Sequence, residues 1–210
     1  MVLAAHLNEI NYAWRMDPMN HASHFPYYVT AMVDVFPIYL PTGGGGQAGA
    51  NAYVWQPKYH ACVLKYQLVT TFLGDIVSLA GPFIGTDDDK GIWQDTWDLH
   101  PMEPWELFLA DAGYAGAIGL LSKYRRAPGQ AVLPHRRAIW NFIQEYYRGA
   151  RGEGPISAFK RHGIFMQGFY RGELFLLDAI VYICGHLTDW ELRSFGPRYQ
   201  GYGPWAHAYT

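Results

Sequence analysis

Four acidic residues of this chain could together bind divalent metal ions. Asp34 lies in TAMVDVFPI, Asp89 in GPFIGTDDDKGIW, Asp111 in LFLADAGYAG and Glu153 in YYRGARGEGPISAFK. Hard cations such as Mg²⁺ and Mn²⁺ prefer oxygen ligands, and a protein usually supplies only one or two carboxylates per ion, with water and substrate phosphate completing the shell. Because the four residues are spread from position 34 to position 153, only a fold that gathers them could make one site.

Asp34 and Asp111 have the most suggestive settings. Asp34 lies in the middle of an apolar, strand-like segment, where a carboxylate is costly unless it is paired or bound to metal. Asp111 directly follows the short apolar segment 106–110, and α/β sheets bind ligands at the carboxyl ends of their strands. If the two strands are neighbours, their carboxylates can bridge two metal ions about 3.5–4 Å apart and assist an in-line phosphoryl displacement. Taken singly, each aspartate is also explained by an Asx turn or a helix N-cap.

The pattern along the chain predicts the elements that must position these residues. Segment 28–39 is rich in β-branched and aromatic residues and predicts a strand that ends at Pro37 or Pro41. Segments 59–72 and 75–81 predict two strands joined by a tight hairpin at Leu73-Gly74. Segment 106–110 predicts another strand, which we expect beside 28–39. Helices are predicted at 87–97, 134–149, 155–170 and 173–192. The fold class is therefore α/β, a mixed sheet with an antiparallel hairpin flanked by helices.

Composition favours one domain. The chain has 210 residues, half of them apolar, which is enough for one full core. We expect an irregular lead-in over 1–28 with at most one short helix, a single domain over 29–192 and a tail over 193–210.

No run approaches the roughly 18 apolar residues of a membrane span, so we expect no membrane partner. The N-terminus lacks the basic start of a signal peptide, and Cys62 and Cys184 have no metal-ligand spacing, which predicts buried free thiols in an intracellular protein.

Charge is divided unevenly along the chain. Residues 1–122 carry a net charge of −8 and residues 123–171 a net charge of +8. An acidic part beside a basic part is typical of a carboxylate site flanked by a surface for a polyanion such as DNA, although a solvated basic helix face is the simpler explanation. The pI of about 6.5 argues against a dedicated DNA-binding module. The basic residues that we expect to follow a DNA backbone are Lys123, Arg125, Arg126, Arg148, Arg151, Lys160 and Arg161.

Segment 33–171 resembles the nuclease domain of DDE-type transposases of the Harbinger and IS5-like group. Four local matches, in order, carry the resemblance. VDVFPI is similar to the segment in which an aspartate opens the motif, and PKYHACVLKYQLVTTFLGDIVSLAGPFIG to the hairpin with its basic first strand. LADAGYAG is similar to the Asp-x-Gly-Tyr element, and YRGARGEGPISAFKRHGIF to the Arg-x-x-x-Glu helix.

This resemblance implies an RNase H-like core and a metal-dependent DNA endonuclease or transposase catalytic domain. Asp34, Asp111 and Glu153 would then be the catalytic, metal-binding triad for Mg²⁺ or Mn²⁺, with Asp89 as an auxiliary residue. Arg148, Arg151 and Lys160 would contact phosphate. The resemblance further implies a nuclear protein whose sequence-specific DNA binding comes from a separate subunit, and it is compatible with an oligomer.

The chain departs from the family pattern at three places. Asp34 is followed by Val-Phe-Pro instead of Gly-Thr-His, and Asp89 ends the run Thr86-Asp87-Asp88-Asp89, so any of those three aspartates could be the auxiliary residue. Glu153 is flanked by two glycines and Pro155, which disfavour a helix interior. Pro155 is better placed at the start of a helix, which leaves Glu153 in the preceding turn and makes Glu145 the alternative third carboxylate.

Two other functions remain open from the sequence. The altered motifs also suit a transposase-derived protein that has lost catalysis and binds DNA or another protein. An unrelated enzyme could instead use His21, His24 and His60 with Asp34 as a transition-metal site, although no HxH or HExxH pattern supports that set.

Overall fold

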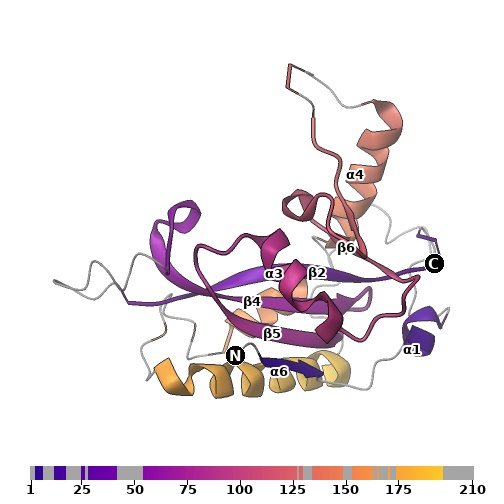
Figure 1. Ribbon diagram of the computed structural model, residues 1–210. Helices are drawn as coiled ribbons and strands as arrows, with labels where there is room; N and C mark the ends of the chain where they lie inside the picture. The colour runs from indigo at the N-terminus through magenta and orange to yellow at the C-terminus, as the bar shows by residue number, and fades with distance from the viewer. Residues whose placement is uncertain are drawn as a thin grey trace.

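The described part of the chain forms a seven-stranded mixed sheet with helices on both faces (Figure 1). This computed structural model describes residues 3–6, 12–17, 25–26, 28–41, 54–126, 128–129, 134–148, 153–162, 165, 170 and 174–195. The strands are β1 (Leu3–His6), β2 (Val29–Tyr39), β3 (Trp55–Gln56), β4 (Ala61–Thr71), β5 (Ile76–Ile84), β6 (Leu107–Ala110) and β7 (Leu120–Ser122). The α-helices are α1 (Tyr12–Met16), α3 (Asp89–Thr96), α4 (His135–Tyr147), α5 (Glu153–Lys160) and α6 (Leu174–Phe195). The 3₁₀ turns among the described residues are η1 (Pro57–Tyr59), η2 (Trp97–Leu99) and η3 (Ala112–Tyr114).

The sheet order is β1-β5-β4-β2-β6-β7, and β3 pairs with β4 outside this path. The pairs β2–β4, β4–β5 and β1–β5 are antiparallel, whereas β2–β6 and β6–β7 are parallel. The hairpin from β4 to β5 turns at Gly74, whose φ of +98° is readily adopted only by glycine. The expected α/β class, the hairpin and the pairing of β6 beside β2 are thus confirmed.

Strand β2 continues through Pro37, which we expected to be one of its end points. The main-chain NH of Leu40 donates to the oxygen of Cys62 in β4, so the even-numbered residues of β2 direct their NH groups toward β4. The nitrogen of Pro37 therefore points to the opposite edge, and β6 has already ended there, because its pairing with β2 extends only to Met32. A proline can occupy a strand where no ladder hydrogen bond is required of its nitrogen.

The two faces of the sheet are covered by different helices. On one face, Phe36 packs in a core with Phe159 of α5 and Leu177 of α6, and Met32 packs against residues of α4. On the other face, Val33 packs with Trp93 of α3. Because side chains alternate along a strand, Asp34 belongs to the face that α4, α5 and α6 cover.

Helix α1 is held to the sheet by a buried ion pair. The guanidinium of Arg15 donates to both carboxylate oxygens of Glu106, at 2.8 and 2.6 Å, and both side chains are fully buried. Thr30 of β2 donates its hydroxyl to the same carboxylate, and the Pro101 carbonyl accepts from Arg15 at 2.8 Å. The start of β6, directly after Glu106, is fixed in this way.

Several elements differ in detail from the expectations. The helix predicted over 155–170 ends at Lys160, where tighter turns back to Ala158 and Phe159 replace the helical hydrogen bonds, and the two-residue strand β3 was not expected. Leu3–His6 is an edge strand paired with β5, within a lead-in expected to be irregular; its alanine and leucine give no strand signal, so pairing with a long neighbour decides its structure. β7 was not expected, because three residues are too few for a periodicity. Helix α5 begins at Glu153, two residues earlier than the position of Pro155 suggested. The two cysteines are free and buried, as expected.

A candidate acidic site beside β2 and β6

Asp34 and Asp111 lie side by side at the point where β6 ends. Met32 pairs with Leu109 in the parallel ladder of β2 and β6, so two residues further along each strand Asp34 reaches the level of Asp111. The backbone of Asp111 is still extended, with φ −73° and ψ −180°, so the alternation of side chains continued one residue past β6 puts it on the face of Asp34.

Asp89 approaches Asp111 from the α3 side. A Cβ atom added to Gly113 would lie 2.8 Å from Asp111 Oδ1 and 3.4 Å from Asp89 Oδ2, so the two oxygens are no farther apart than the sum of these distances. The other two acids of the run make local contacts: Asp87 accepts from the NH of Ile84 at 3.2 Å, and Asp88 caps α3 by accepting from the NH of Gly91. The geometry therefore selects Asp89 from the three as the neighbour of Asp111.

Asp111 also makes a local turn. Its Oδ1 accepts from the NH of Gly113 at 2.6 Å and caps η3. The turn explanation for this residue is therefore confirmed, and the same carboxylate lies beside Asp89. Because the cap engages Oδ1, the Oδ2 atom of the same carboxylate remains available as an acceptor.

Asp34 is paired with Arg148. Its Oδ2 lies 3.0 Å from Arg148 Nη2 at the end of α4, and its Oδ1 accepts from the NH of Val35 at 2.9 Å. Burial nevertheless raises the pKa of Asp34 above its usual value of 3.8, and the charges of Asp111 and Asp89 raise it further, while Arg148 lowers it. Asp34 is thus close enough to the other two carboxylates for their charges to act on it.

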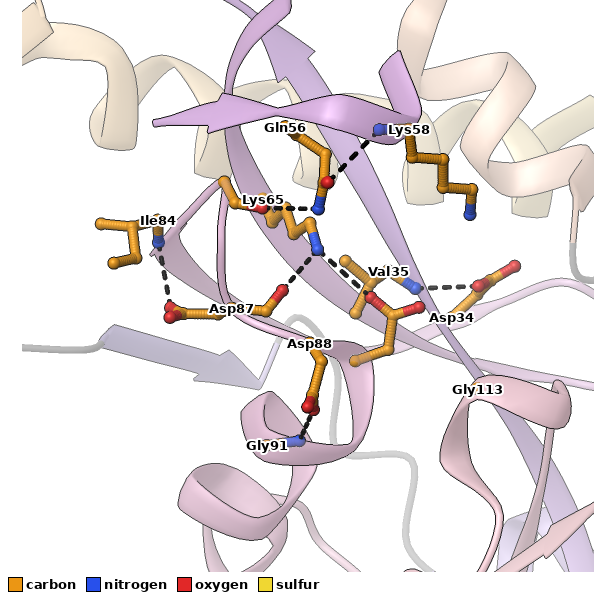
Figure 2. A network of polar contacts seen from close by, with 12 residues as sticks. Asp34, Val35, Gln56, Lys58, Lys65, Ile84, Asp87, Asp88, Gly91 and Gly113 are labelled. Atoms are coloured by element: carbon orange, nitrogen blue, oxygen red, sulfur yellow. Dashed lines mark hydrogen bonds and ion pairs between the residues drawn. The ribbon is translucent and has the colours of Figure 1, made fainter. Parts of the chain in front are cut away.

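Lysines surround the acidic group. Lys65 of β4, itself almost fully buried, lies 3.5 Å from Asp89 Oδ1 and donates to the main-chain oxygen of Asp87 (Figure 2). Burial raises the pKa of Asp89, and the charges of Lys65 and Lys58 oppose that effect. Burial lowers the pKa of Lys160 on α5, and the charge of Asp34 opposes that effect. Lys160 therefore lies within electrostatic reach of Asp34.

Tyr114 packs with Val33 and Trp93, within reach of the charges of the three aspartates, and was not foreseen from the sequence as a site residue. Its side chain is fully buried, and the nearest polar partner of its hydroxyl is the side chain of Gln67, which lies beyond ordinary hydrogen-bond geometry. Burial raises the pKa of Tyr114 well above 10, and the charges of Asp34, Asp89 and Asp111 raise it further. The phenol therefore stays protonated and can donate a hydrogen bond. The Asp-x-Gly-Tyr element was the signal that could have identified it.

The other expected site residues are less closely grouped. Glu153 is the first residue of α5. Ile156, three residues later, lines a small hollow, open to solvent, together with Asp34 and Arg148. Glu145, the alternative third carboxylate, is 74% exposed and pairs with Lys123 at 3.3 Å.

The expected basic residues differ in their surroundings. Arg125 donates to the main-chain oxygen of Ala112 beside Asp111. Arg126 is exposed, and Arg161 lies 3.9 Å from Glu191. Arg151, His21 and His24 lie outside the described residues, and His60 is exposed at the turn that follows η1.

The acidic group does not form a closed metal cage. Among the residues that the structure describes, no group of three or more His, Cys, Asp or Glu side chains has the geometry to hold a metal ion. Asp34 lies on one face of the sheet and Asp89 comes from the helix on the other, and both already have a cationic partner. Carboxylate oxygens are the donors that a hard cation prefers, so Asp111 and Asp89, which both lie beside Gly113, suit such an ion in their chemistry.

Comparison of the chain with family models, curated proteins and solved structures finds no match. In the described part of the chain, no helix is both long and apolar enough to cross a membrane.

Proposed function

We propose that this chain is a metal-dependent nuclease or transposase catalytic domain with an RNase H-like core, which cleaves DNA phosphodiester bonds. The observation that carries this proposal is the position of Asp34 and Asp111 at the same level of two neighbouring parallel strands, with Asp89 beside them. Carboxylates at such a strand end are the ligands that phosphoryl-transfer sites use for Mg²⁺.

The strand order supports the RNase H-like part of the proposal. Strands β2, β4 and β5 form an antiparallel unit with β2 at its edge, and the parallel strands β6 and β7 extend the sheet beyond β2. Helix α3 provides the connection from β5 to β6. An RNase H-like core has this order of three antiparallel and two parallel strands, with its first acidic residue on the central strand.

Each residue has a distinct part in the proposed reaction. Bound Mg²⁺ or Mn²⁺ would activate the attacking hydroxyl and stabilise the leaving oxygen. Asp34 and Asp111 would hold the ions, and Glu153 would complete the site from α5. Lys160 and Arg148 would turn from Asp34 to the phosphate once the metal neutralises that carboxylate, because an arginine or lysine binds phosphate oxygens well.

The test is nicking of supercoiled plasmid in Mg²⁺ or Mn²⁺, a substrate that requires no known target sequence. We expect the wild-type chain to nick the plasmid, and Asp34→Asn and Asp111→Asn each to reduce the rate at least about 100-fold, as for loss of a group that acts in the transition state. Asp98→Asn, an exposed aspartate of η2, is the matched control and should keep full activity. Equal nicking by the wild type and both site variants would rule out this site.

A second candidate function is a binding module without catalysis, and the ion pairs favour it. Arg148 and Lys65 already neutralise Asp34 and Asp89, as expected of a site that no longer takes metal. Calorimetric titration with Mn²⁺ separates the two functions. Binding that disappears in Asp34→Asn supports the nuclease, whereas no binding together with retained DNA affinity supports the module.

A further inference from the structure

An exposed tyrosine lies among arginines on the segment that follows β7. Residues 123–126 read Lys-Tyr-Arg-Arg, and Tyr124 is 47% exposed. Arg125 and Arg126 are exposed beside it, as are Arg136 and Arg137 in the first turn of α4. This tyrosine and the four arginines are here called the Tyr124 platform. Aromatic rings interleaved with cations are the arrangement with which proteins bind single-stranded nucleic acid.

The main chain of Tyr124 is fixed against α4. The side-chain amide of Asn141 accepts from the NH of Tyr124 at 2.8 Å and donates to its main-chain oxygen at 2.9 Å. The preceding residue, Lys123, pairs with Glu145 at 3.3 Å. Asn141 and Glu145 are four residues apart, so the segment runs along one stripe of the helix. The ring therefore stands on a main chain that α4 holds in place before any ligand binds.

Arg137 holds the ring itself. Its guanidinium lies 4.9 Å from the centre of the Tyr124 ring, which is a cation–π contact. The bonds from Asn141 attach the segment to α4 without the ring, so the ring is not required for that attachment. An aromatic side chain that is already ordered loses little conformational freedom when a base stacks on it, which favours binding.

The Tyr124 platform adjoins the acidic site. Arg125 donates to the main-chain oxygen of Ala112, the residue after Asp111. Strand β7, which precedes the platform, pairs with β6, and Asp111 directly follows β6. Figure 1 shows α4 standing out from the sheet beside β6. A DNA strand bound on the platform therefore lies next to the carboxylates.

The charge of this surface suits a polyanion. The platform contributes four exposed arginines, and the neighbouring carboxylate of Glu145 is already paired with Lys123. Neutralising phosphates with arginine releases counterions, which favours association with nucleic acid. In a duplex, the faces of the bases are covered by the neighbouring base pairs, so only an unpaired base offers its face to a tyrosine. The ring and the arginines together therefore favour a single strand.

We propose that the Tyr124 platform binds single-stranded DNA, with a base stacked on Tyr124 and phosphates bound by Arg125, Arg126 and Arg136. The strand that enters the acidic site is then unpaired on the α4 side of the carboxylates. This inference names the form of the substrate and so rests on the proposed function, but strand binding needs no metal and is measured separately from cleavage.

Fluorescence anisotropy in EDTA compares oligo(dT) of about 20 nucleotides, longer than the binding site of a small domain, with a duplex of the same length. Tyr124→Ala should weaken oligo(dT) binding about tenfold, the loss of one stacked base, and leave duplex affinity unchanged. Tyr124→Phe keeps the ring and should bind like the wild type. Phe175→Ala removes another exposed aromatic side chain, 79% exposed on α6, and is the control that should bind both DNAs normally.

The outcomes separate this inference from the proposed function. Wild-type oligo(dT) affinity in Tyr124→Ala, or equal losses on oligo(dT) and duplex, would overturn it, and tighter binding of oligo(rU) would assign the platform to RNA instead. If the wild type does not nick plasmid but binds oligo(dT) through Tyr124, the platform stands and the cleavage proposal fails. If it nicks plasmid while Tyr124→Ala binds oligo(dT) normally, the reverse holds.

Discussion

Asp34 is held at an energetic disadvantage in the folded chain. Burial raises the pKa of its carboxyl even though Arg148 lies 3.0 Å away, so the ionised form is less favourable here than in water. A carboxyl group whose pKa burial raises, in the middle of a strand with two other acids nearby, is typical of functional sites.

This disadvantage predicts the pH dependence of stability in Asp34→Asn. Because the pKa is raised on folding, the folded wild type releases its proton at higher pH than the unfolded chain, and stability falls as pH rises from 3.8 through the raised value. The amide cannot ionise and avoids this loss. We expect Asp34→Asn to be at least as stable as the wild type at pH 7, with an advantage that shrinks as pH is lowered toward 4. Thermal unfolding of both proteins across this range measures the effect. The prediction is contradicted if the stability difference between variant and wild type favours the variant less at pH 7 than at pH 4.

Arg148 competes with any cation for Asp34. The pair is partly exposed, with 29% of the Asp34 side chain accessible, and exposed ion pairs contribute about 0.2–1 kcal/mol. We expect Arg148→Gln to tighten Mn²⁺ binding by no more than about fivefold, the factor that corresponds to that energy, while weakening DNA binding. Calorimetry with Mn²⁺ measures the first effect. Arg193→Gln, on α6 beside Asp75 and Asp189, is the control that should leave Mn²⁺ affinity unchanged.

At the scale of elements, the pair of Arg15 and Glu106 joins α1 to the start of β6. Removing one partner leaves the other charge buried without compensation, which costs about 3–5 kcal/mol. We therefore expect Arg15→Met to lower the free energy of unfolding by about that amount in a urea titration. The double variant Arg15→Met with Glu106→Gln should recover part of the loss, because it removes the second buried charge. An Arg15→Met chain as stable as the wild type would contradict the role of this pair.

The sequence predicted the elements whose signals are local. Alternation and turn residues predicted β2, β4 and β5, and helical spacing predicted α4 and α6. The grouping of Asp34 with Asp111 followed from the position of Asp111 directly after an apolar strand. That inference needed only the rule that ligands bind at strand ends.

Features that depend on distant partners could not be predicted. The buried pair of Arg15 and Glu106 joins residues 91 positions apart, and neither residue differs in type from a surface charge. The choice of Asp89 among three consecutive aspartates depends on which one faces Gly113. The counter-ions Lys65 and Arg148 likewise come from β4 and from the end of α4, so only the assembled fold brings them to the carboxylates.

At the scale of the whole molecule, the acidic and basic parts of the sequence come together at the acidic site. Asp34, Asp89 and Asp111 come from the acidic part of the chain, and Arg125, Arg148 and Lys160 reach them from the basic segment 123–171. A phosphate backbone that approaches the carboxylates would therefore meet cations on the side of α4 and α5. If the proposed function is correct, DNA would follow these cations to the carboxylates.

The path predicts a salt-dependent affinity for DNA. Arg126 and Arg136 are exposed, on the segment after β7 and in the first turn of α4, and neither is needed for the core. Each phosphate contact contributes about 0.9 to the slope of log affinity against log salt concentration for duplex DNA. We expect Arg126→Gln with Arg136→Gln to lower that slope by about 2 in fluorescence anisotropy, with similar losses on unrelated sequences, because phosphate contacts carry no base information. Arg193→Gln on α6 should keep the wild-type slope, and an unchanged slope in the double variant would place the DNA elsewhere.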